Sequence, residues 1–438
     1  MIKAKNKMGL IFFPAYDWAI EETHPEREER LLYTQDQLRE EGVFDIEGIV
    51  EYKPDVATEE DVMRTHFCFP DVASVTTESH MISAGGAIKA ARLVKDGAVK
   101  KAFALVRPPG HHAMKVVHGN RGFCNINNEA IMIEYLRDRY GVKKIAVVDT
   151  DCHHGDGTQD IYWHDPNVLF ISMHQDGRTL YPGSGHTTEA GGPNARGRTV
   201  NIPLPPGTSD EGFLYTIDNM VLPILKDFKP EVVVNSAGQD NHYSDPITNM
   251  NFSAQGYAIL NDRLSPDIAV LEGGYSIQGA LPYVNLGIVL AMAGVDYSHV
   301  REPNFDEIEE DIRQERAISA YIERLTDTVL GIYFKPVTDR ELVYPGDYIT
   351  RKKSIYYDTD GIQETQMESV MKCNDCAGLL SIESASSVNP LSLGIEIPAG
   401  ACPSCRDEGL KLLDRSKKQK KYAVIQVINR IDKEYFRL

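Results

Sequence analysis

The sequence of 438 residues lacks several features that would indicate other classes of protein. No apolar run approaches the length of a membrane span, and the run at residues 10–13 is too short for the core of a signal peptide. Basic residues are fewer than acidic residues, and the formal net charge of −18 argues against sequence-independent binding to nucleic-acid phosphates. Seven cysteines, an odd number, do not suggest a disulfide framework. We therefore expect a cytoplasmic protein that contacts neither membranes nor nucleic acids directly.

The first three hundred residues alternate short apolar runs with helical patterns. Because buried strands separated by helices form parallel βαβ units, this alternation predicts a three-layer α/β fold. The predicted strands are residues 9–13, 102–106, 145–148, 168–172, 232–235 and 268–271, and the clearest predicted helices are 81–95, 128–140, 211–226 and 254–264.

Polar residues gather where these strands end. RPPGHH follows one strand, DTDCHHGDG the next, SAGQD a third and EGGYS the last. Ligand sites in open parallel sheets lie beyond the carboxyl ends of the strands. The sequence therefore predicts one site at one edge of the sheet.

The character of the chain changes beyond Pro303. Residues 304–316 are charged and look helical, and residues 317–334 have the pattern of a more apolar helix. The α/β rhythm then stops, and only residues 423–428 read as a strand. We place a boundary near residue 340, with a catalytic domain over 1–340 and an extension over 341–438.

Asp151, His153 and Asp240 are candidate metal ligands. Residues two apart in an extended segment point the same way, so Asp151 and His153 can face one ion, and Asp240 can add a second carboxylate from another strand end. Three protein ligands leave a fourth position open, which is typical of catalytic zinc. Such an ion acidifies water and polarises a carbonyl.

His111 and His112 are candidates for proton transfer beside that metal. Each imidazole needs a partner on its far nitrogen, and Asp149 and Asp156 remain available for this. Different partners can give the two rings different pKa values, as acid–base chemistry at neutral pH requires. The alternative is that the histidines are themselves metal ligands or buried polar groups of the core.

Tyr275 follows two glycines at a strand end. Gly273 and Gly274 allow backbone or substrate to approach closely. A phenol at this place can donate a hydrogen bond to a developing oxyanion. Alone, the motif is equally compatible with a tyrosine of the core.

These motifs, taken together and in order, resemble the zinc-dependent histone deacetylase family, on its class II and bacterial deacetylase-like side. The resemblance covers roughly residues 10–300. It implies an arginase/deacetylase fold, in which helices flank a central, mainly parallel sheet of eight strands. The matching stretches are HPEREER (24–30), RPPGHHA (107–113), GFCNINN (122–128), VVDTDCHHGDGTQ (147–159), ISMHQDG (171–177), LYPGSG (180–185), SAGQDNHYSDP (236–246) and LEGGYS (271–276).

The resemblance also implies a role for each matching residue. Zinc would be held by Asp151, His153 and Asp240, and Tyr275 would polarise the scissile carbonyl. His111 and His112 would be the catalytic pair, with Asp149 behind the first and Asp156 behind the second. Further implied residues are the tunnel wall of Gly122, Phe123 and Tyr181, and a potassium site of Asp149, Asp151, His153, Ser172 and Met173, largely through backbone oxygens.

Four positions depart from the family's pattern or match it loosely. Tyr181 stands where phenylalanine is common and adds a hydroxyl to the tunnel wall, and Cys152 replaces an aliphatic residue between two metal ligands. Ile247 stands where polyamine-selective relatives carry an acidic residue. An aliphatic residue at this position weakly favours acyl-lysine over acyl-polyamine as the substrate. Asp71 is the nearest candidate for an aspartate that grips the substrate backbone at the rim.

The extension carries two CxxC pairs, CNDC and CPSC. Cys373, Cys376, Cys402 and Cys405 can supply the closed tetrahedral thiolate set of a structural zinc, in a zinc-ribbon-like arrangement. The alternatives are four unrelated cysteines or a redox pair. Such an extension could mediate homo-oligomers or dock a protein partner.

The sequence thus predicts a zinc amidohydrolase that removes acetyl or other acyl groups from lysine in proteins or peptides. One alternative is a deacetylase of acetylated polyamines or another small amide. A second is an arginase-type hydrolase with two manganese ions, which needs additional ligands. A third, from another class, is a non-catalytic scaffold that binds acyl-lysine.

Overall fold

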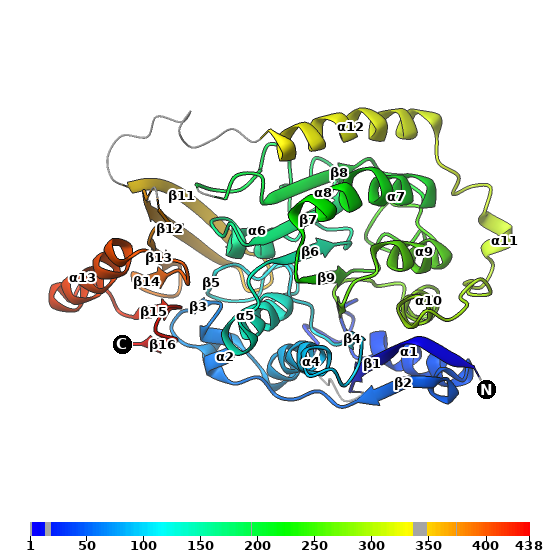
Figure 1. Ribbon diagram of the computed structural model, residues 1–438, viewed down its shortest axis with the longest axis horizontal. Helices are drawn as coiled ribbons and strands as arrows, with labels where there is room; N and C mark the ends of the chain where they lie inside the picture. The colour runs from blue at the N-terminus through cyan, green and yellow to red at the C-terminus, as the bar shows by residue number, and fades with distance from the viewer. Residues whose placement is uncertain (1, 14–18, 194, 336–347, 374) are drawn as a thin grey trace.

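The central element of the fold is a parallel sheet of eight strands (Figure 1). The computed structural model describes residues 2–13, 19–193, 195–335, 348–373 and 375–438. The predicted eight-stranded sheet is confirmed, and every pairing of neighbouring strands within it is parallel. The strand order is β2 (Glu47–Tyr52), β1 (Lys3–Phe12), β4 (Lys101–Leu105), β10 (Ile268–Leu271), β9 (Val232–Ala237), β6 (Ile145–Asp149), β7 (Val168–Gln175) and β8 (Thr199–Leu204).

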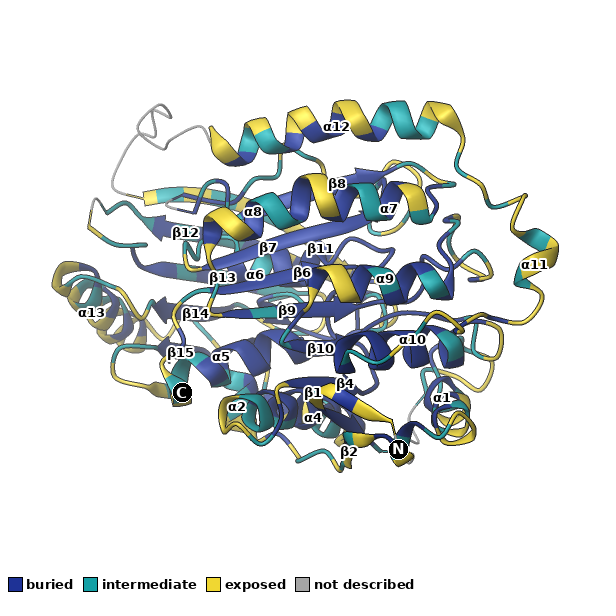
Figure 2. Cartoon of the chain, turned by 45° about the vertical axis from the view of Figure 1, so that its right-hand side comes forward, coloured by how far each residue is buried: buried dark blue, intermediate teal, exposed yellow. Residues whose placement is uncertain are grey.

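Two groups of helices cover the sheet. One group contains α4 (Glu78–Lys95) and α5 (Asn128–Tyr140), which pack on each other. The other contains α1 (Glu29–Glu40), α10 (Leu281–Ala293), α9 (Ala254–Leu264) and α7 (Asp210–Thr216). Apart from the edge strand β2 and the start of β1, the strands between them are almost entirely buried (Figure 2), as a parallel sheet covered on both faces requires.

The sequence identified the inner strands better than the edges. All six predicted strands exist, whereas the edge strands β2 and β8 were missed because β2 has only a short apolar run between Gly48 and Glu51 and β8 contains Asn201 and Pro203. The helix predicted over 317–334 is α12 (Arg316–Phe334). The helix predicted over 304–316 is wrong apart from the single turn α11 (Phe305–Ile308), and the five acidic residues crowded into 306–311 explain this by mutual repulsion.

The C-terminal unit is a second α/β layer and is larger than a zinc ribbon. The predicted boundary near residue 340 lies outside the described residues. Beyond it, six strands form one sheet, and α13 (Pro403–Gln419) connects the parallel strands β14 and β15. The strands, in sheet order, are β11 (Tyr348–Tyr357), β12 (Ile362–Met371), β13 (Leu380–Ser386), β14 (Ser392–Ile397), β15 (Ile425–Asn429) and β16 (Glu434–Arg437).

This unit packs against the first through a shared hydrophobic core. Phe67 of β3 (Phe67–Cys68) and Val116 of β5 (Val116–Val117) lie in one buried cluster with Ile382 and Ile428. The contact is close, since a Cβ added at Gly394 would lie 2.6 Å from the ring of Phe67. The two units therefore share buried surface rather than being joined by a tether alone. No helix within the described residues is long and apolar enough to span a membrane.

Candidate active site

Three potential metal ligands converge beyond the ends of two neighbouring strands. Asp151 and His153 follow β6, Asp240 follows β9, and β6 pairs with β9. One ligand atom from each lies within 4.8 Å of the others. His153 Nδ1 is 2.9 Å from an oxygen of Asp240 and 3.3 Å from an oxygen of Asp151. The residues that the sequence selected are thus brought to one point.

Backbone groups hold the two carboxylates in place. The Gly273 N–H donates to Asp151 Oδ2 over 2.7 Å, and the Cys152 N–H donates to Asp240 Oδ1 over 2.7 Å. A Cβ at Gly273 would lie 2.4 Å from Asp240 Oδ2, so only glycine fits there. Gly273, predicted to face substrate, therefore supports the metal ligands directly. Gly274 has φ +124 and accepts a hydrogen bond from Arg30.

The chemistry of this cluster fits a divalent cation. Asp151 and Asp240 are fully buried, and two uncompensated carboxylates in such a place are costly. Burial lowers the pKa of His153, but Asp240 and Asp151 outweigh it and raise that pKa to about 10. The two carboxylates thus require a positive charge beside them, either a protonated His153 or a metal ion. Two carboxylate oxygens and one imidazole nitrogen suit zinc with an open fourth position.

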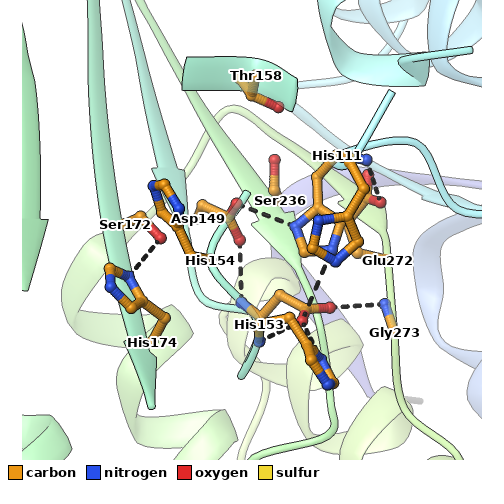
Figure 3. Close-up of polar contacts among 12 residues, drawn as sticks. His111, Asp149, His153, His154, Thr158, Ser172, His174, Ser236, Glu272 and Gly273 are labelled. Atoms are coloured by element: carbon orange, nitrogen blue, oxygen red, sulfur yellow. Dashed lines mark hydrogen bonds and ion pairs between the residues drawn. The ribbon is translucent and has the colours of Figure 1, made fainter. Parts of the chain in front are cut away.

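The histidine pair lies beside the ligands, and each ring has its own carboxylate. His111 Nδ1 is 3.1 Å from Asp149 Oδ2, a contact drawn as a dashed line in Figure 3, and His112 Nδ1 is 2.8 Å from Asp156 Oδ1. The far nitrogen of His111, Nε2, lies 3.7 Å from Asp151 Oδ1. The structure therefore pairs the histidines with the two aspartates that the sequence proposed.

The two rings differ in their electrostatics. Burial lowers the pKa of His111, but Asp151 and Asp149 outweigh it and move that pKa well above 6.5. Burial and the neighbouring His111 lower the pKa of His112 to about 3. Asp156 raises the pKa of His112 only in part, because the Asp156 carboxylate also pairs with Arg121 at 2.6 Å. His112 is therefore neutral and can accept a proton, whereas His111 favours the charged form while the cluster holds no cation.

A cavity of about 230 Å³ leads to these groups. Its wall includes the predicted tunnel residues and Tyr275, whose ring meets Phe123 edge-on at 5.7 Å. The Tyr275 N–H donates to Asp245 Oδ2 over 2.7 Å. The cavity is lined by Pro109, His111, His112, Gly122, Phe123, His153, Leu180, Tyr181, Ile247, Tyr275 and Asp358.

Several supporting residues were not singled out from the sequence. Arg30 is fully buried, lies 5.0 Å from the centre of the Tyr275 ring, and pairs with Glu26, which also binds Arg107. Glu272 accepts from the N–H of His111 over 3.0 Å. Charged residues inside HPEREER, RPPGHH and LEGGYS were the available signal, since buried charges must be paired.

The family resemblance also predicted a potassium site and a substrate-binding role for Asp71. Asp149 and Ser172 lie opposite each other in the pairing of β6 with β7, which is compatible with the predicted potassium site but does not test it. Met173 is buried in β7. Asp71 is not among the cavity residues; it caps α3 (Val72–Val75) and pairs with Arg437 at 3.3 Å. These contacts do not test the substrate role of Asp71 at the rim, which stays a prediction.

The four cysteines of the two CxxC pairs also converge. Their sulfur atoms lie within 4.8 Å of one another, although the pairs come from the end of β12 and the start of α13. Backbone N–H groups point at the sulfurs, from Asp375 to Cys373 over 3.4 Å and from Gly378 to Cys376 over 3.3 Å. Burial raises the pKa of Cys373, but these contacts and the neighbouring thiols lower it to about 7. The cluster can hold a metal ion.

Comparisons with known proteins agree with this geometry. Residues 71–286 match the family model described as histone deacetylase domain. A probable deacetylase of Archaeoglobus fulgidus is 47% identical over 308 residues, which cover 64% of this chain and 84% of that protein. A histone deacetylase-like amidohydrolase of Pseudomonas aeruginosa is 37% identical over 226 residues, 52% of this chain and 61% of that protein. The crystal structure of the HDA15 HD domain superposes with a TM-score of 0.64 at 25% identity, covering 75% of this chain and 96% of that one. The chain belongs to the histone deacetylase family.

Proposed function

We propose that this protein is a zinc-dependent deacylase that removes acetyl or other acyl groups from lysine side chains of proteins or peptides. The observation that carries the proposal is the cavity itself. It leads to an Asp–His–Asp ligand set, and a neutral histidine and a tyrosine line it. Zinc held there would supply an acidified water and a polarised carbonyl.

The chain's own residues then have distinct tasks. His112, neutral and fixed by Asp156, is suited to accept a proton at Nε2. The Tyr275 hydroxyl is suited to donate to the oxygen on which negative charge develops. Burial raises the pKa of that phenol well above 10, so it keeps its proton. His111, held by Asp149, can return a proton to the leaving amine.

Two features of the cavity support an acyl-lysine substrate. Its walls of Phe123, Leu180 and Tyr181 are apolar enough for a methylene chain. Ile247 also lines it, and an aliphatic side chain there offers nothing to the ammonium groups of a polyamine. The two-manganese alternative is weaker, because the cluster formed here by described residues has three ligands, too few for two ions.

A panel of substrates tests the proposal. It should contain peptides with lysine acylated by chains of increasing length, together with acetylspermidine, each with and without a chelator. We expect metal-dependent turnover of the peptides, restored when zinc is added back. Turnover of acetylspermidine alone would instead support the polyamine alternative. Binding of the peptides without any hydrolysis would support the scaffold alternative.

A further inference from the structure

The β11–β12 hairpin of the C-terminal unit reaches the active-site cavity. Its strands pair from Tyr348↔Met371 to Tyr357↔Ile362, so residues 358–361 form the turn at its tip. Asp358, the first residue of that turn, lines the same cavity as His112 and Tyr275. The segment that matches the family model ends at residue 286, and the proposed catalytic residues all precede residue 276. Asp358 therefore adds a part of the wall from outside that segment.

The hairpin tip is held firmly against the deacetylase domain. Tyr357 is 1% exposed, and its hydroxyl oxygen lies 2.9 Å from the Val116 carbonyl oxygen and 2.8 Å from a carboxylate oxygen of Glu364, so that its one proton is shared between these two acceptors. On the far side of the turn, Asp360 accepts the Asn120 N–H over 2.6 Å. A Cβ at Gly119 would lie 2.4 Å from that Asp360 carboxylate. The position of Asp358 therefore follows from packing on both sides of it.

Asp358 contacts two wall residues of the cavity. Its Oδ1 accepts the Gly122 N–H over 2.9 Å. The Tyr181 side chain lies near it as well; burial is the main reason that the pKa of Tyr181 is raised, and the nearby Asp358 carboxylate raises it further. The hydroxyl that distinguishes Tyr181 from a phenylalanine thus has a carboxylate of the C-terminal unit nearby.

The two wall residues also contact the catalytic histidine. A Cβ at Gly122 would lie 2.5 Å from His112 Cδ2 and 3.0 Å from Tyr181 Cε1, so there is no slack between the wall and the ring. The rings of Tyr181 and His112 meet edge-on at 5.2 Å. Movement of either wall residue changes the width of the channel next to His112.

We propose that Asp358 is a positioning residue of the deacylase, which holds Gly122 and Tyr181 in place so that the β11–β12 hairpin completes the acyl-lysine channel. This inference rests on the proposed function, because the channel is defined by that substrate. It gives the C-terminal unit a direct part in substrate binding, in addition to any structural role.

The test uses the full-length, metal-loaded protein and one acetyl-lysine peptide. Asp358→Ala should raise KM by about three- to tenfold, the size of one lost hydrogen bond, while kcat changes less than about threefold. Asp358→Asn keeps an acceptor oxygen and should recover most of the KM. Tyr181→Phe should raise KM too, and adding it to Asp358→Ala should cost less than the sum, because the two side chains act on the same part of the cavity wall.

Two further variants separate positioning from general stability. Asp360→Ala removes a hydrogen bond of the same turn outside the cavity, so its melting temperature should fall at least as much as that of Asp358→Ala, with a smaller change in KM. Asp414→Ala, on the exposed face of α13, should match the wild type. Equal KM values for Asp358→Ala and wild type would overturn the inference.

Failure of the inference is distinguishable from failure of the proposed function. If the wild type hydrolyses the peptide and Asp358→Ala behaves identically, only the role of Asp358 is lost. If the wild type hydrolyses no acyl-lysine peptide, the proposed function fails, and the inference fails with it.

Discussion

Lys115 of the deacetylase domain and Glu396 of β14 form a buried ion pair, with Nζ 2.6 Å from Oε2. Arg430 approaches the other oxygen of Glu396 at 2.7 Å and also pairs with Glu134 of α5. Two cations and two carboxylates therefore alternate across the contact between the units. Breaking one member of such a buried set leaves an uncompensated charge, which is strongly destabilising.

This pair predicts a pH-dependent contribution to stability. Burial raises the pKa of Glu396, but Lys115 and Arg430 outweigh it and lower that pKa to about 2. A lowered pKa in the folded state stabilises the protein above the unfolded value of 4.5, and this stabilisation is lost as the pH falls toward 2. Glu396→Gln should therefore lower the free energy of unfolding at pH 7 by about 3 kcal/mol, and the difference from wild type should shrink between pH 4.5 and 2.

Urea denaturation at several pH values measures this difference. Glu47→Gln, which removes an exposed pair with Lys3, should shift the midpoint little and serves as the control. A difference between Glu396→Gln and wild type that stays constant from pH 7 to pH 2 would contradict the assignment.

The role of Tyr275 predicts a loss of rate without a loss of fold. Tyr275→Phe removes one hydroxyl and almost no volume, so the contacts of the ring with Phe123 and Arg30 persist. We expect turnover to fall about 10²–10³-fold, as for the loss of one oxyanion donor. KM should change much less, since the ground-state carbonyl carries less charge than the transition state. Tyr356→Phe, at an exposed position, should have wild-type rates; a fully active Tyr275→Phe would remove the oxyanion role.

His112→Ala should separate proton transfer from metal binding. His112 is not in the ligand cluster, so the protein should keep its metal content while turnover falls about 10²–10⁴-fold. His111→Ala should also slow turnover, although the loss can be smaller. Turnover and zinc content are measured on the same samples, with the exposed His299→Ala as control. Near-normal rates in both active-site variants would mean that other groups move the protons.

The two clusters predict two zinc ions per chain. Cys402→Ser should lower the count from two to one and leave the ion of the Asp–His–Asp cluster, whereas Asp240→Asn should remove that ion and leave the cysteine-bound one. Native mass spectrometry counts the ions directly. One ion in the wild type that survives replacement of all four cysteines would show that the cysteine cluster binds none.

The active site was easier to predict than the unit that packs beside it. Asp151, His153 and Asp240 stand at ends of inner strands, where apolar runs mark the strand and polar residues mark the edge of the sheet. No pattern in the sequence indicated that Asp358 and Tyr181 line one cavity, because the two residues lie far apart in sequence and Asp358 sits in an ordinary turn. Of the C-terminal sheet, only β15 was predicted, from residues 423–428, and the other strands were missed for a related reason. Strands such as β11 and β12 do not alternate regularly between polar and apolar residues, and the buried positions of β12 include Glu364, Gln366 and Glu368, so the sequence does not mark their buried face.

The hydrogen bond between Gly122 and Asp358 spans 236 residues of sequence. At 5–20 residues per second, a ribosome needs roughly 10 to 50 seconds to travel that distance. Asp240, the last of the three metal ligands in the chain, is made within that interval. A nascent chain therefore contains every residue of the Asp–His–Asp cluster for several seconds before the last part of the channel wall has been translated. The order of synthesis makes the channel the final part of the active site to be completed.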